Sequence, residues 1–203
     1  MKWIGIDFDN TIVDYDDVFL TAAKERGLVD EKIRGGKEAI REVLRLKPNG
    51  ENAWQSLQGY VYGKRITDAV MFEGFATFLR LCRAQGHRIS IVSHKTEYGH
   101  FDESRLNLRE AARSWMQARG FFDEDGFGLC RDEVFFEGTR ADKIERIAKL
   151  RFTHFIDDLP EVLDDPAFPK DVTPILFTNG TAQSASRSNA FAHWCDIAGA
   201  ILR

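Results

Sequence analysis

Carboxylates lie at the ends of two apolar segments whose composition is typical of buried β-strands. Asp7 and Asp9 lie at the end of the first segment, and Asp157 and Asp158 directly follow a later one. Acidic side chains beside a buried strand are costly unless they are paired or bind a ligand. Four carboxylates in one place would repel one another unless a cation joined them, and an oxygen-rich acidic site suits Mg²⁺. The sequence therefore predicts a magnesium site.

Two further positions carry groups suited to phosphate. Ser93 ends another apolar segment and is followed by His94 and Lys95, while Lys143 lies in the first turn of a predicted helix. A magnesium ion and a lysine can together hold a phosphoryl group, because phosphoryl transfer depends mainly on positioning and charge neutralisation. Lys143 is the preferred cation. Lys95 is an alternative to it, and whether His94 or Lys95 joins the site stays open.

The segments that must position these residues alternate between strand and helix patterns. Strands are predicted at residues 3–8, 88–93, 153–156 and 174–178, with a weaker candidate at 133–136. Apolar residues at helical spacing lie between them. This alternation implies an α/β fold with a doubly wound parallel sheet covered by helices on both faces. Ligands bind beyond the carboxyl ends of the strands in such a sheet, which is where the polar residues lie.

The C-terminal part of the chain has two further patterns. The spacing of Phe191, Trp194, Ile197 and Ile201 predicts a terminal helix that closes over the sheet. The polar segment 181–189 before it is predicted to be a loop.

One region breaks the alternation of strands and helices. Residues 16–66 lack a convincing strand pattern but contain three helical stripes, within 18–23, 40–44 and 54–61. Gly and Pro residues lie at the joints between the stripes. The sequence therefore predicts a small, mostly helical insertion at residues 14–71, in a catalytic α/β core made of residues 1–13 and 72–203.

Composition narrows the class of protein. The chain has 203 residues, of which 43% are hydrophobic, so it can bury a sizeable core. Its net charge of -4 argues against nucleic acid or an anionic membrane as a partner. Cys82, Cys130 and Cys195 show neither a disulfide framework nor zinc-site spacing, which favours the reducing cytoplasm. No signal-peptide or membrane-spanning pattern is present in the sequence.

The motifs, taken in order, resemble those of the haloacid dehalogenase (HAD) superfamily. They are Ile6-Asp7-Phe8-Asp9-Asn10-Thr11, Ile91-Val92-Ser93, Lys143, and Phe155-Ile156-Asp157-Asp158. The resemblance covers residues 1–13 and about 72–180, and the insertion falls where one branch of the superfamily has its cap domain. It implies a Rossmann-like core whose helical cap closes over the site. It also implies a Mg²⁺-dependent phosphomonoester hydrolase acting on a small phosphorylated metabolite.

The resemblance also implies the catalytic roles. Asp7 would attack phosphorus to form an aspartyl-phosphate. Asp9 would protonate the leaving alcohol and later deprotonate the attacking water. Ser93, Lys143 and Asn10 would bind phosphate, and Asn10 occupies a position that is often Gly in the superfamily.

The metal ligands implied by the resemblance come from the two acidic motifs. They are the carboxylate of Asp7, the backbone carbonyl of Asp9, and Asp157. Asp158 would act either directly or through a water molecule, and the sequence leaves both arrangements open.

Other functions on related folds are weighed against hydrolysis. A phosphotransferase would use the same residues with an alcohol acceptor in place of water. A receiver-like module would carry its acidic pair on the first strand, whereas here that strand carries Asp7-Phe8-Asp9 and the acidic pair comes last. A non-catalytic phosphate-binding protein is expected to lack an essential group, and each motif is present.

Overall fold

The computed structural model describes residues 1–102, 104–180 and 189–203, and the chain forms two compact units. The core unit consists of Met1–Val13, Met71–Lys95 and Gly120–Arg203. The insertion unit consists of Asp14–Val70 and Thr96–Arg119. Most of the loop predicted at 181–189 lies outside the described residues.

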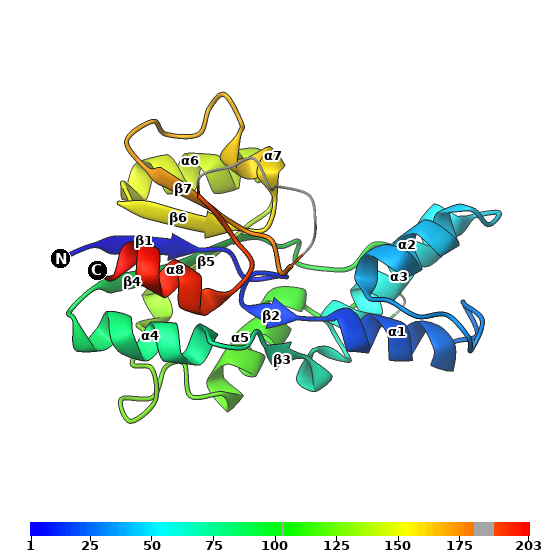
Figure 1. Cartoon of the computed structure of the whole chain (residues 1–203). Coiled ribbons are helices and arrows are strands. Elements are labelled where there is room, and N and C mark those ends of the chain that lie inside the picture. Colours follow the sequence, from blue (N-terminus) through cyan, green and yellow to red (C-terminus); the bar gives the residue numbers. More distant parts are fainter. Residues whose placement is uncertain (103, 181–188) are drawn as a thin grey trace. The chain divides into compact units, whose positions relative to one another are not determined.

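A parallel sheet forms the centre of the core unit (Figure 1). Among the described residues it has six strands in the order β5-β4-β1-β6-β7-β8, and each neighbouring pair is parallel. The strands are β1 (Trp3–Ile6), β4 (Arg88–His94), β5 (Val134–Glu137), β6 (His154–Asp157), β7 (Thr173–Phe177) and β8 (Ala190–Phe191). The predicted α/β fold with a parallel sheet is confirmed.

Helices cover both faces of this sheet (Figure 1). They are α4 (Phe75–Ala84) and α8 (Trp194–Ile201) on one face, and α6 (Arg140–Leu150) and α7 (Pro160–Leu163) on the other. On the first face the Trp194 ring packs against Phe75 and Phe78, with ring centroids 4.8 and 5.0 Å apart. Burial on both faces explains why the strands have nearly continuous apolar sequences.

The last helix begins later than its sequence pattern predicts. The spacing places Phe191 in the helix, but Phe191 lies in β8 opposite Phe177 of β7, and α8 begins at Trp194. The backbone N–H of Thr178 donates to the carbonyl oxygen of Phe191 at 2.9 Å. A strand of two residues is too short to show a period of its own, and it depends on the neighbouring strand β7 for its hydrogen bonds.

The insertion unit is mainly helical. Its helices are α1 (Asp16–Glu25), α2 (Lys37–Arg45), α3 (Gly50–Tyr62), the short 3₁₀ turn η1 (Ile66–Asp68) and α5 (Leu108–Ala118). The first three coincide with the three predicted stripes. The short strands β2 (Val13–Asp14) and β3 (Val70–Met71) pair where the chain enters and leaves the first segment, and a second 3₁₀ turn, η2 (Arg131–Glu133), belongs to the core unit.

The helix α5 is attached to the first segment of the insertion unit by polar contacts. The indole Nε1 of Trp115 donates to the Ala69 carbonyl oxygen at 3.0 Å, and an Arg119 nitrogen donates to the same oxygen at 2.6 Å. The Arg119 guanidinium also stacks on the Trp115 ring, 4.1 Å from its centroid. The limits of a cap domain and its closing role stay predictions.

Among the described residues, no helix has the length and the apolar composition that a membrane crossing requires.

Gly5 in β1 allows two phenylalanine rings to pack against the strand that leads to Asp7. A Cβ atom at this position would lie 2.5 Å from Cδ2 of Phe155 and 2.7 Å from the Phe152 ring. We expect Gly5→Ala to lower the free energy of unfolding by about 1–3 kcal/mol, because the rings must leave their packed positions. Urea denaturation followed by circular dichroism measures this change.

Gly199 provides the matched control for this substitution. It lies in α8, and a Cβ there would meet its nearest atom, from Arg203, at 3.6 Å. Gly199→Ala should therefore stabilise the protein by about 0.5–1 kcal/mol, the usual gain in a helix. Equal stability of Gly5→Ala and the wild type would contradict the close packing around β1.

Candidate active site

The register of the sheet brings the two acidic motifs together at its carboxyl edge. Ile6 at the end of β1 pairs with Ile156 of β6, and the Asp7 N–H donates to the Ile156 carbonyl oxygen at 2.9 Å. Asp7 therefore lies beside Asp157. One carboxylate oxygen from each of Asp7, Asp157 and Asp158 lies within 4.8 Å of the others. We call these three residues the acidic cluster.

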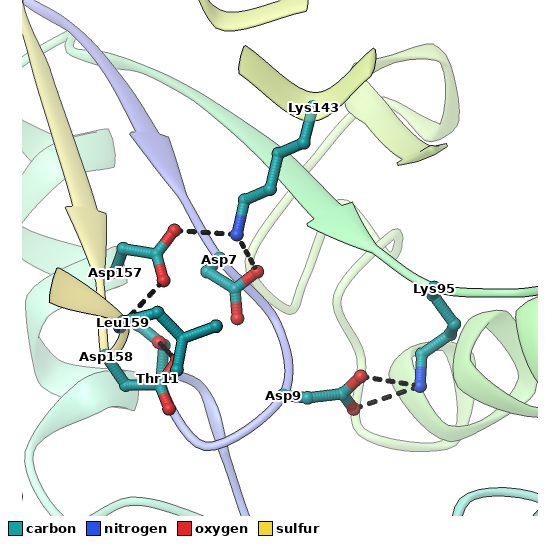
Figure 2. A network of polar contacts seen from close by, with 8 residues as sticks. All are labelled: Asp7, Asp9, Thr11, Lys95, Lys143, Asp157, Asp158 and Leu159. Carbon is teal, nitrogen blue, oxygen red and sulfur yellow. Dashed lines mark hydrogen bonds and ion pairs between the residues drawn. The ribbon is translucent and has the colours of Figure 1, made fainter. Parts of the chain in front are cut away.

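Lys143 lies between two members of the acidic cluster (Figure 2). Its Nζ is 2.6 Å from Asp7 Oδ1 and 2.6 Å from Asp157 Oδ2. The lysine is only 1% exposed. Burial by itself would lower the pKa of Lys143, but attraction by Asp157 and Asp7 outweighs burial and raises the pKa above its ordinary value. Lys143 is therefore a cation held between two carboxylates.

Asp157 is the most deeply buried member of the acidic cluster. Burial raises its pKa from 3.8 to about 6, with Lys143 opposing the rise and Asp7 adding to it. Its Oδ1 accepts a hydrogen bond from the Leu159 N–H at 3.0 Å. Within the described residues Oδ2 has an ion pair with Lys143 Nζ at 2.6 Å and no further polar partner. This buried oxygen keeps acceptor capacity for a cation.

The donor set of the acidic cluster fits a divalent cation. Three carboxylates face one lysine, so negative charge is in excess. Carboxylate oxygens are the ligands that Mg²⁺ prefers, and Asp157 Oδ2 has capacity left for an ion. These residues therefore suit the metal that the sequence predicts.

Thr11 is a member of the site to which the sequence assigns no role. It is fully buried, and its Oγ1 donates to Asp158 Oδ1 at 3.3 Å. Its backbone oxygen accepts from Trp194 Nε1 at 3.2 Å, which anchors the turn to α8. Thr11 thus orients Asp158. The only sequence signal for this contact is the position of Thr11 within the first motif.

Asp9 lies outside the acidic cluster and pairs with Lys95. Lys95 Nζ is 3.0 Å from Asp9 Oδ1 and 2.7 Å from Asp9 Oδ2. Figure 2 shows the Asp9 carboxylate turned toward Lys95, whereas the Asp7 carboxylate faces Lys143. Strand β1 ends at Ile6, so the alternation that puts residues i and i+2 on one side does not extend through Asp9. The two aspartates therefore have different lysine partners.

The other predicted residues lie around the same edge of the sheet. Asn10 has a φ of 59°, in the left-handed region that Gly and Asn tolerate best, and its N–H donates to the Val13 carbonyl oxygen at 3.0 Å. This conformation explains how Asn can occupy a position that is often Gly. Ser93 is buried near the end of β4. The sequence left open whether His94 or Lys95 joins the site. His94 is exposed, and its Nε2 lies 3.1 Å from the Gly138 carbonyl oxygen. Lys95, in contrast, contacts the predicted site residue Asp9.

Comparison with known proteins gives information on the fold. No protein-family model and no curated protein matches the sequence. A haloacid dehalogenase-like hydrolase from Streptococcus pneumoniae has a similar structure, with a TM-score of 0.64, 15% identity, and coverage of 98% of this chain and 98% of that chain. Protein Tyrosine Kinase A from Mycobacterium tuberculosis gives a TM-score of 0.65 at 16% identity, covering 98% of this chain and 97% of that chain.

A predicted phosphoglycolate phosphatase from Haemophilus somnus is also similar, with a TM-score of 0.57, 15% identity, and coverage of 98% of this chain and 97% of that chain. Identities this low concern the fold and leave the substrate open. The strand order of the sheet and the acidic cluster at its carboxyl edge are consistent with the fold of these proteins. The similarity to these structures shows that the chain has the fold of the HAD-superfamily hydrolases, as its motifs imply.

Proposed function

We propose that the protein is a Mg²⁺-dependent phosphomonoester hydrolase that acts on a small phosphorylated metabolite through an aspartyl-phosphate on Asp7. The contact that carries this proposal is the buried Lys143 ammonium, 2.6 Å from both Asp7 and Asp157 at the carboxyl edge of a HAD fold. It joins a nucleophile, a cation and a metal-binding carboxylate in one place. We also propose a cytoplasmic location, which the three free cysteines support.

The chain's own residues supply the two steps of the reaction. Lys143 holds Asp7 through Oδ1, so the nucleophile enters the reaction already oriented. A carboxylate oxygen of Asp7 attacks phosphorus, the bond to the substrate oxygen breaks, and Asp9 gives its proton to the leaving alcohol. In the second step Asp9 takes a proton from water, which attacks the same phosphorus. Asp7 is then restored and inorganic phosphate is released.

The remaining site residues bind the metal and the phosphoryl group. Asp7, Asp157 and the Asp9 carbonyl oxygen would hold Mg²⁺, with Asp158 either as a direct ligand or through water. When bound, the ion neutralises negative charge on the phosphoryl oxygens. Ser93, Lys143 and Asn10 would bind those oxygens from the protein side.

Metal removal tests the proposed function. We expect the protein to hydrolyse p-nitrophenyl phosphate with added Mg²⁺, and EDTA to slow hydrolysis by about 100-fold or more, because a metal supplies several kcal/mol of charge stabilisation. Release of p-nitrophenol measures the rate, and excess Mg²⁺ should restore it. Equal rates with and without the metal would contradict the proposal.

A phosphotransferase is the second candidate function, and the structural similarity to Protein Tyrosine Kinase A favours considering it. Such an enzyme would transfer the phosphoryl group from Asp7 to an alcohol in place of water. Assays with p-nitrophenyl phosphate as donor and glycerol or a tyrosine peptide as acceptor separate the two functions. A hydrolase releases one inorganic phosphate per p-nitrophenol, whereas a phosphotransferase releases less and forms a new ester.

A further inference from the structure

Lys95 is a buried cation that has no role in the reaction described above. It directly follows β4 and is 3% exposed. Its backbone N–H donates to the Glu137 carbonyl oxygen at 2.9 Å, so pairing with β5 continues beyond the end of the strand. Its Nζ lies 5.6 Å from the centroid of the fully buried Phe8 ring. The sheet thus holds the backbone of Lys95, and the charged end reaches the first motif.

The ammonium group of Lys95 contacts both carboxylate oxygens of Asp9, at 3.0 and 2.7 Å. A contact to both oxygens from a buried side chain restricts the rotation of the carboxylate. In Figure 2 this contact turns Asp9 toward Lys95 and away from Asp7. Asp9 lies only two residues from Asp7, whose carboxylate is held by Lys143.

An Asp9 carboxylate without this partner would be attracted elsewhere. The other buried lysine near the first motif is Lys143, which is ion-paired with Asp7 and Asp157. A divalent cation bound in the acidic cluster would attract the Asp9 carboxylate, because opposite charges attract. Asp9 drawn toward the cluster would no longer be placed to give a proton to the leaving group.

We propose that Lys95 is a positioning residue for Asp9, and that it holds the Asp9 carboxylate apart from the acidic cluster. The inference rests on the proposed function and deepens it. Lys143 orients the nucleophile Asp7, and Lys95 orients the acid and base Asp9. The two aspartates of the first motif then pair with different buried lysines.

The dependence of the rate on the leaving group tests this proposal. In a two-step reaction kcat/KM covers only the steps up to formation of the aspartyl-phosphate. An alkyl alkoxide needs a proton to leave, whereas p-nitrophenolate does not. We expect Lys95→Met to lower kcat/KM for β-glycerol phosphate by about 10–100-fold, and for p-nitrophenyl phosphate by less than about 3-fold, since general acid catalysis supplies the difference. Equal losses with both substrates, or an effect confined to KM, would overturn the proposal.

A double-mutant cycle shows whether Lys95 acts through Asp9. Asp9→Asn should itself reduce kcat/KM for β-glycerol phosphate. Adding Lys95→Met to that variant should then change the value by less than about 2-fold, because two residues that act as a unit do not add. A further 10-fold loss in the double variant would mean that Lys95 acts on the substrate directly, and the proposal would be wrong.

Control variants separate a loss of Asp9 positioning from a loss of folding, and separate this inference from the proposed phosphatase function. Lys149→Met removes an exposed lysine of α6, and both substrates should react as with the wild type. If thermal unfolding shows that Lys95→Met does not fold, Lys95→Gln is the second variant. Its shorter, uncharged side chain lacks the ammonium group that contacts both Asp9 oxygens, so it should show the same selective loss. A wild type inactive on both substrates would overturn this inference and the proposed function together. An active wild type whose Lys95 variants lose both activities equally would overturn this inference alone.

Discussion

Asp7→Asn is expected to lower phosphatase activity by about 10⁴-fold or more, the scale of loss when a covalent nucleophile is removed. The amide of Asn is a poor nucleophile and cannot form the aspartyl-phosphate. Asp7 lies at the end of β1 with Lys143 at 2.6 Å, so the loss should appear in kcat with every phosphate ester. Initial rates with p-nitrophenyl phosphate measure it. Mass spectrometry of acid-quenched protein should show one added phosphoryl group on the wild type and none on the variant.

A matched substitution separates nucleophile loss from a general charge effect. Asp171 is an exposed aspartate of the core unit, and Asp171→Asn should leave both the rate and the phosphoryl adduct unchanged. Asp7→Asn should still fold, because Lys143 keeps its ion pair with Asp157. Retention of more than about a tenth of the wild-type rate in a folded Asp7→Asn protein would exclude Asp7 as the nucleophile.

Lys143→Met is expected to cause the largest loss of stability among these variants. It removes the ammonium group from between the buried Asp7 and Asp157, leaving two carboxylates that repel each other. Removing one partner of a buried ion pair costs about 3–5 kcal/mol. For a chain of this size that corresponds to a fall in Tm of roughly 10 °C. Differential scanning calorimetry in EDTA measures this effect.

Two comparisons sharpen the Lys143→Met experiment. Lys149→Met removes an exposed lysine from the same helix and should change stability by at most about 0.5 kcal/mol. Added Mg²⁺ should recover part of the stability that Lys143→Met loses, because a cation in the acidic cluster replaces the missing positive charge. Equal Tm values for Lys143→Met and the wild type in EDTA would show that the ion pairs do not stabilise the core unit.

The sheet could be predicted from the sequence because most of its strands are buried on both faces and have distinct apolar compositions. The same patterns predicted the joining of Asp7 and Asp157, since parallel strands end at one edge of a sheet. The edge strands were harder to predict. The candidate at 133–136 was weak although β5 forms at Val134–Glu137, and β8 has only two residues, of which Phe191 was assigned to a helix.

The partner of Asp9 could not be predicted from the strand pattern of β1, for a physical reason. The direction of the Asp9 carboxylate depends on a turn that begins where β1 ends, so strand alternation gives no guide to it. The strand pattern of β4 did contain a signal that favours Lys95 over His94. Burial alternates along the end of β4, with Ser93 buried, His94 exposed and Lys95 buried, as side chains on opposite faces of a strand should be.

The division of the insertion unit into two chain segments limits how this protein can be recombined with others. Its helix α5 lies in the second segment, and the buried face of that helix includes Trp115, which contacts Ala69 at the end of the first. Replacing residues 14–70 as a single cassette would leave that apolar face facing a foreign surface, with aggregation as the usual result. A chimera must therefore exchange both segments together, as would any evolutionary event that gave the core unit a new insertion.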